Sequence, residues 1–277
     1  MKELNFIGRG SAFNIDEHNN SAYIKEGKTM LLIDCGESIA RKIIKDNLLD
    51  GVENLYIIIT HFHSDHAGSL GTLIFHCKYN LNIIPTIHYP DFDALKGFLL
   101  YQGLIHLDDY LYIDFASHMP KELINDLDIK AIHKAKADHD SITIVEKVMR
   151  EDFLVESKSK NIFKAYCYGI NFNDDSKIYY SGDNCRVFSG SLLKNYDRLY
   201  QDTTSADFSG NIHLSLRELC ESVPKEYRHK VYCMHINNKE LIDSARKEGF
   251  NVVETERIWL YERQSVWLEK RKYKNWR

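Results

Sequence analysis

Short runs of apolar residues recur along the chain, and polar, charged or glycine-containing segments separate them. Runs of this length that are rich in β-branched and aromatic residues are typical of β-strands. They predict strands at residues 3–7, 21–27, 29–34, 54–60, 81–88, 141–148, 152–157, 164–172 and 177–183. In the last third of the chain, residues 197–203 and 230–236 show the same pattern.

Other segments are better interpreted as helices, and they alternate with the strands. They are residues 38–49, 66–80, 214–223 and 239–249, the last of which ends at Gly249. Two series of strands, each followed by helices, predict a four-layer α/β/β/α sandwich. Because no linker or repeat interrupts the sequence, residues 1–277 are expected to form a single domain.

Polar residues with ligand chemistry follow three of the predicted strands. The segment 54–60 is nearly all apolar, as a strand covered on both faces is, and "HFHSDH" follows it directly. Asp183 follows the strand at 177–183, and His235 lies at the end of another. Because open α/β sheets place their sites at the carboxyl ends of strands, these residues are expected to share one site.

His61, His63, Asp65 and His66 are the strongest chemical signal in the sequence. Neutral imidazoles together with a carboxylate are ligands for Zn²⁺, Mn²⁺ or iron. The cysteines are not clustered, which argues against a structural zinc site. The sequence therefore predicts a metal centre of the catalytic type.

Composition limits the class of partner. The 36 lysines and arginines against 40 acidic residues give a net charge of −4, so no broad basic field is available to hold extended nucleic acid. The six dispersed cysteines are typical of reduced thiols in a cytosolic protein. No signal peptide or membrane span is expected from the apolar runs, so the predicted location is cytoplasmic.

Six motifs give the chain a specific resemblance. The segment "THFHSDHAG" resembles the signature of the metallo-β-lactamase fold hydrolases, and the chain resembles their ribonuclease Z-like branch over nearly its whole length. The supporting motifs are "FIGRGSAF" at 6–13, "LLIDCGE" at 31–37, "YYSGDN" at 179–184, "NIHLSLRELCESVP" at 211–224 and "YCMHINN" at 232–238. The resemblance implies the αββα sandwich of that fold.

The resemblance also implies a site with two divalent metal ions, Zn²⁺ or Mn²⁺, which clamp a phosphate and activate water. His61 and His63 would hold the first ion together with a third histidine. Asp65, which the resemblance also makes catalytic, would hold the second ion with His66 and His235. Asp183 would bridge both ions. His213 would be a catalytic histidine that donates a proton to the leaving oxygen, and Asp34 would orient a ligand.

One ligand of the resembled pattern is missing. In this branch the third histidine lies eight residues before the glycine of a strand that is here "CYG", with Gly169, and that position is Asn161. An asparagine carbonyl is a weaker ligand, and His133 or His139 would have to replace it from an earlier loop. The first site is thus expected to be weak or empty. A labile first ion, catalysis with one ion, or a centre that binds without turnover remain open.

The resemblance points to a small phosphodiester as substrate. The layout looks most like compact cyclic-nucleotide phosphodiesterases, which include phage enzymes that destroy the cyclic CMP and cyclic UMP signals of bacterial Pycsar defence. For a phage protein, the predicted location would be the host cytoplasm. The alternatives are a ribonuclease Z-like RNA phosphodiesterase and a non-catalytic nucleotide-binding protein. A homodimer is also expected, with the apolar run at 101–112 as a candidate surface.

Overall fold

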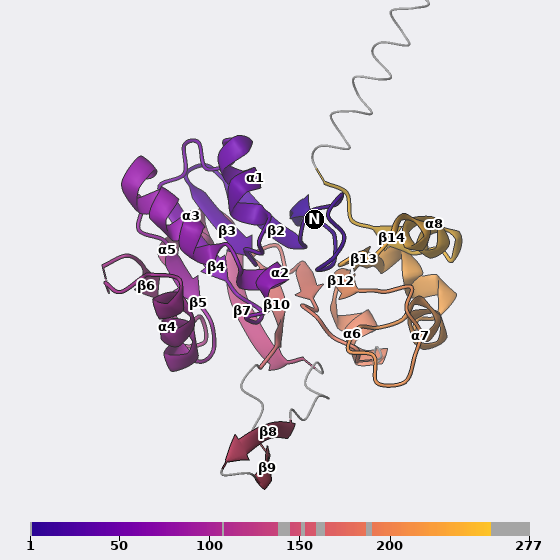
Figure 1. The fold of residues 1–277 in the computed structure, drawn as a ribbon. Coiled ribbons are helices and arrows are strands. Elements are labelled where there is room, and N and C mark those ends of the chain that lie inside the picture. Colours follow the sequence, from indigo (N-terminus) through magenta and orange to yellow (C-terminus); the bar gives the residue numbers. More distant parts are fainter. Residues whose placement is uncertain are drawn as a thin grey trace, which may run out of the picture.

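The computed structural model describes residues 2–106, 108–137, 145–150, 153–158, 164–186 and 190–255. Its centre is a pair of six-stranded mixed sheets (Figure 1). The first sheet has the order β1 (Asn5–Gly8), β2 (Ser21–Glu26), β3 (Thr29–Ile33), β4 (Asn54–Ile58), β5 (Thr86–His88), β6 (Leu111–Tyr112). The second has the order β14 (Asn251–Val252), β13 (Val231–Met234), β12 (Arg198–Asp202), β11 (Lys177–Tyr180), β10 (Tyr166–Phe172), β7 (Ile129–Lys136). Two further strands, β8 (Val145–Arg150) and β9 (Phe153–Lys158), pair only with each other.

Helices cover the outer face of each sheet (Figure 1). The first sheet packs against α1 (Ile39–Lys45), α3 (Leu70–His76) and α4 (Phe92–Tyr101). The second packs against α6 (Gly190–Asn195), α7 (Leu216–Ser222) and α8 (Lys239–Lys247). The other helices are α2 (Ser64–Ala67), α5 (Lys121–Asn125), the π-helix η1 (Cys77–Leu81) and the 3₁₀-helix η2 (Lys225–Lys230). The predicted four-layer α/β/β/α sandwich is confirmed.

The alternation of side chains along β4 shows how the layers form. Leu55 and Ile57 point into the core under the helices, whereas Tyr56 and Ile58 point into the core between the sheets. All four are buried, as the nearly continuous apolar run predicted. Burial of an aliphatic side chain contributes about 1.5–3 kcal/mol, so a strand covered on both faces is held firmly in register. The residues that follow β4 therefore start from a fixed point.

Two element predictions were wrong in their bounds. The predicted helix at 66–80 is divided into α2, α3 and η1, because Ser69 lies between α2 and α3 and its hydroxyl bonds to the carbonyl of Gly36. The predicted strand at 81–88 is reduced to β5. Asn82 turns the chain with a left-handed φ of 55° before β5 begins.

The predicted end of the last helix is confirmed. Asn238 caps α8 by accepting a hydrogen bond from the amide of Leu241, and Gly249 lies just beyond the helix with a φ of +89°. The six cysteines, all within the described residues, form no disulfide. None of the helices in the described ranges has the length and apolar content needed to cross a membrane.

Candidate metal centre

The ends of parallel strands bring the predicted ligands together. In the first sheet, Asp34 follows β3 and His61 follows its parallel neighbour β4. In the second, Asp183 follows β11, Asp202 ends β12 and His235 follows β13, and these three strands are also parallel. The site therefore lies at the edge where the carboxyl ends of both sheets meet, as expected for open α/β sheets.

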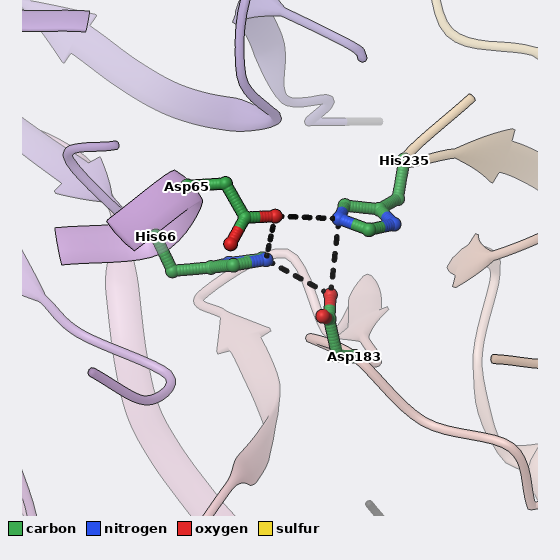
Figure 2. A group of neighbouring side chains, drawn as sticks. All are labelled: Asp65, His66, Asp183 and His235. Atoms are coloured by element: carbon green, nitrogen blue, oxygen red, sulfur yellow. Dashed lines mark hydrogen bonds and ion pairs between the residues drawn. The ribbon is translucent and has the colours of Figure 1, made fainter. Parts of the chain in front are cut away.

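The first cluster consists of Asp65, His66, Asp183 and His235, and all four are buried (Figure 2). Figure 2 shows the two carboxylates and the two rings pointing toward one another from α2 on one side and the ends of β11 and β13 on the other. The Nε2 atom of His66 lies 3.0 Å from Asp183 and 3.4 Å from Asp65. The Nε2 atom of His235 lies 3.1 Å from Asp65 and 3.5 Å from Asp183.

This donor set fits a divalent cation. Although His66 Nε2 and Asp183 Oδ1 are close and buried, neither has a hydrogen-bond partner of acceptable geometry among the described residues. Burial without such a hydrogen bond costs free energy, and a cation bound between these atoms would remove that cost. Two imidazole nitrogens and two carboxylates that converge on one point are the ligands that Zn²⁺ and Mn²⁺ take.

A second cluster, which corresponds to the predicted site of the first ion, joins His61 and His63 to Asp183. The Nε2 atom of His61 lies 3.7 Å from Asp183, and the rings of His61 and His63 are 4.5 Å apart. Asp183 therefore belongs to both clusters, as a bridging ligand must. His61 is buried, whereas His63 is exposed.

The question of a third ligand for this second cluster stays open. Asn161 and His139 lie outside the described residues. His133 lies on β7 with its side chain exposed, and its Nε2 atom is 3.4 Å from the side-chain nitrogen of Asn171. Within the described part of the chain, it belongs to none of the clusters with metal-ligand geometry.

Asp34 lies behind the first cluster and orients His66. Its carboxylate is 2.9 Å from His66 Nδ1 and accepts hydrogen bonds from the amide and hydroxyl of Thr60. With Nδ1 held in this way, His66 presents Nε2 to the centre. Burial raises the pKa of Asp34 above its ordinary value, while His66 and Thr60 act in the opposite direction. The geometry agrees with the predicted orienting role.

Asp202 is a functional residue that the sequence interpretation missed. It is fully buried, and its carboxylate lies 2.7 Å from Nδ1 of His213 and 3.3 Å from Nδ1 of His235. The backbone amide of Asn184 also donates to it. An acidic residue at the end of an apolar strand was the available signal, because Asp202 occupies the same place on β12 that the predicted ligands occupy on neighbouring strands. His213 itself is partly open to solvent, with 24% of its side chain exposed.

Comparison with known proteins assigns the chain to a family. The family model described as "Anti-Pycsar protein Apyc1" matches residues 2–259. This chain belongs to the Apyc1 family. A curated Apyc1 relative from Bacillus phage BSP38 is 25% identical over 246 residues, which are 84% of this chain and 88% of the relative. Another, from Bacillus phage 010DV004, is 28% identical over 249 residues with the same coverage.

Solved structures show the same fold at lower identity. The metallo-β-lactamase fold protein YhfI from Bacillus subtilis aligns with a TM-score of 0.60 and 17% identity, over 91% of this chain and 94% of YhfI. The short form of human tRNase Z aligns with a TM-score of 0.58 and 15% identity, over 91% and 96% of the two chains. The resemblance inferred from the six motifs is thus confirmed, and this Apyc1 chain has the metallo-β-lactamase fold.

The electrostatics of the Apyc1 centre favour ionised carboxylates. Burial raises the pKa of Asp183, but His235 and His66 outweigh it and hold the pKa well below its usual range. Burial lowers the pKa of His235, yet Asp183 and Asp202 raise it to about 10. In the metal-free chain the histidines thus neutralise the buried carboxylates. A divalent cation would take over that role and displace the protons.

Proposed function

We propose that this chain is a metal-dependent phosphodiesterase that hydrolyses a 3′,5′-cyclic mononucleotide. The observation that supports it best is a pair of ligand clusters that share Asp183, beside a histidine that is held by Asp202 and partly open to solvent. Membership of the Apyc1 family supports a role against cyclic-nucleotide defence, in which a phage would remove the signal.

The side chains of the centre have separate tasks. Asp65, His66 and His235 would hold one ion, His61 and His63 another, and Asp183 both. When bound, two divalent ions supply positive charge to the phosphate and lower the pKa of a water molecule. Asp34 keeps His66 in the tautomer that presents Nε2.

His213 would donate a proton to the leaving oxygen. Burial lowers its pKa, but Asp202 outweighs this effect and raises the pKa above its ordinary value, which favours the protonated ring. The bond from Nδ1 to Asp202 fixes the ring, and Nε2 would be the donor. Protonation of the leaving oxygen makes cleavage of the ester bond easier.

The charge of the chain favours a compact substrate. A net charge of −4 gives no field to retain a long polyanion, whereas a single phosphodiester needs only the local charge of the centre. Cleavage of RNA is therefore a less favoured alternative. The second alternative is a protein that binds a nucleotide without turnover.

Hydrolysis by the purified chain tests the proposal. A panel of 3′,5′-cyclic mononucleotides is incubated with Mn²⁺ or Zn²⁺, beside a His61→Ala/His63→Ala variant. Turnover by the wild type alone supports the proposal. No turnover with either metal refutes it; cleavage of a precursor transfer RNA would then favour the ribonuclease, and nucleotide binding without product the non-catalytic alternative.

We also propose that the chain forms a homodimer. Among the described residues, seven of the ten exposed large apolar side chains lie between positions 79 and 111: Tyr79, Ile84, Phe92, Leu100, Tyr101, Ile105 and Leu111. Two of the elements in this range, α4 and β6, adjoin at one edge of the first sheet, where the rings of Phe92 and Tyr112 are 4.5 Å apart (Figure 1). Apolar patches are seldom left open on monomers, and a second copy presenting the same patch is the simplest cover.

The molar mass of the protein, measured by light scattering as it elutes from a size-exclusion column, tests the homodimer. Tyr101→Glu should convert a dimer into a monomer, while Phe208→Glu, at an exposed apolar residue elsewhere, should leave the mass unchanged. A monomeric wild type would refute this part of the proposal.

A further inference from the structure

Three consecutive residues at the entrance to β2 lie beside the metal centre, and two of them bond to residues of the centre. They are Asn19, Asn20 and Ser21. Because β2 runs antiparallel to β3, its first residues lie at the edge where β3 ends and the site begins. All three side chains are buried.

Asn20 connects the first sheet to the second. Its side-chain oxygen accepts a hydrogen bond of 3.4 Å from the backbone amide of His235, and its side-chain nitrogen donates one of 2.8 Å to the hydroxyl of Tyr180. Tyr180 ends β11 and His235 follows β13, so one amide group touches two strands of the other sheet. Asn20 is only 1% exposed, which removes water as a substitute partner.

The residues on either side bond within the first sheet. The hydroxyl of Ser21 donates a 2.8 Å hydrogen bond to the carbonyl of Asp34, the residue that orients His66. The side chain of Asn19 accepts hydrogen bonds from the amide and hydroxyl of Ser38, just before α1. The same short segment therefore touches the supports of both halves of the centre.

Two of these supported residues have an unfavourable backbone. Asp34 has a φ of 65° and His235 a φ of 59°, in the left-handed region that costs a residue with a side chain about 1 kcal/mol or more. Such a conformation persists only where neighbouring contacts hold it. For His235, Asn20 provides such a contact, and the backbone bond from Ile236 to Arg9 provides another from the same sheet.

We infer that Asn20 is a positioning residue that sets His235, on the second sheet, against Asp65 and His66, on the first. The inference rests on the proposed metal centre and concerns its assembly. Without the Asn20 amide, the turn at His235 loses a bond that fixes its backbone, and the Nε2 atom of His235 is no longer held 3.1 Å from Asp65. The ion shared by the two sheets should then bind more weakly.

The test measures Zn²⁺ affinity of the whole chain, without substrate, by competition with a chromophoric chelator. Asn20→Ala should lower the affinity for the ion held by Asp65, His66 and His235 by about 10- to 100-fold, which is the usual effect of removing a group that supports a ligand. Tyr180→Phe keeps the volume of the ring but removes one partner of Asn20, so it should cause a smaller loss of affinity. Thermal unfolding in a chelator shows whether each variant folds.

Two controls separate positioning from general stability. Asn54→Ala removes a comparable 3.3 Å bond, to Thr29, at the opposite end of the sheet and should leave Zn²⁺ affinity unchanged. In a His235→Ala background, Asn20→Ala should cause no additional loss, because Asn20 acts through His235.

The possible outcomes are distinct. Unchanged affinity in Asn20→Ala, or an equal loss with and without His235, overturns the inference. A wild type that binds no Zn²⁺ overturns the inference, and it overturns the proposed function as well only if Mn²⁺ supports no turnover. A wild type that binds Zn²⁺ but hydrolyses no cyclic nucleotide overturns only the proposed function.

Discussion

The carboxylate of Asp202 is hydrogen-bonded to Asn184 and His213 and lies 3.3 Å from Nδ1 of His235, and Asp202→Asn perturbs these contacts in a way that the geometry specifies. One carboxylate oxygen, Oδ2, accepts from the amide of Asn184 and faces Nδ1 of His213, while the other, Oδ1, faces Nδ1 of His235. In the asparagine, the carbonyl oxygen should remain at the Asn184 amide, because that donor cannot reverse. The NH₂ group must then face His235.

Two magnitudes follow. In Asp202→Asn, the NH₂ group donates to Nδ1 of His235, so the ring proton of His235 must lie on Nε2, the atom that faces Asp65. A protonated Nε2 cannot bind the ion, which should therefore bind about 10- to 100-fold more weakly. His213 still faces an oxygen acceptor at residue 202, but this acceptor no longer carries a negative charge. Because hydrogen bonds to charged groups contribute about 1.5–3 kcal/mol and neutral ones about 0.5–1.5, the loss is about 1–1.5 kcal/mol. At saturating metal this is a decrease in kcat of about 5- to 13-fold.

The assay is hydrolysis of a cyclic mononucleotide over a range of Mn²⁺ concentrations, which separates apparent metal affinity from kcat. Asp207→Asn is the matched control, since Asp207 pairs with Arg217 at the surface. If kcat falls while the metal dependence stays that of the wild type, the inferred orientation of the amide is wrong. If neither changes, Asp202 has no part in the centre.

Three further predictions concern the ligands and pH. His61→Ala/His63→Ala should abolish hydrolysis while thermal unfolding stays cooperative; surviving activity would remove both residues from the site. Asn161→His should raise both the metal content measured by mass spectrometry and the activity without added metal, and no change in either would mean that the third ligand lies elsewhere. The raised pKa of His235, about 10, stabilises the metal-free fold below about pH 6.5, and this contribution is lost as pH rises toward 10. The increase in Tm caused by Zn²⁺ should therefore be larger at pH 8 than at pH 6.5, and an equal or smaller increase would contradict the assignment of His235 as a ligand.

The fold was predictable where burial imposes a clear pattern. The apolar run of β4 and the capped helix α8 were recognised because tertiary packing and local sequence agree there. In contrast, β7 was missed, since six of its eight side chains are exposed or half-exposed at a sheet edge and include Lys130, Lys134 and Lys136. An edge strand with one wet face carries charges that hide its pattern.

The site was predictable as far as its ligands are clustered in sequence. His61, His63, Asp65 and His66 lie within six positions, and Asp183 and His235 follow recognisable strands. Asp202 and Asn20 were not found, because their importance depends on partners 11 and 215 positions away. A buried carboxylate or amide acquires its role from the groups that the fold places beside it.

The division of the ligands between two sheets also affects when the protein is able to take up metal during its synthesis. Asp65 and His235 are 170 positions apart, so the ribosome must complete β13 before the two residues can meet. The nascent N-terminal sheet carries only the HxHxDH half of the proposed ligands, so it would retain an ion less firmly than the finished chain. Metal capture would therefore be a late event, which cannot precede docking of the C-terminal sheet. A cell with little available metal would accumulate folded chains that still await their ions.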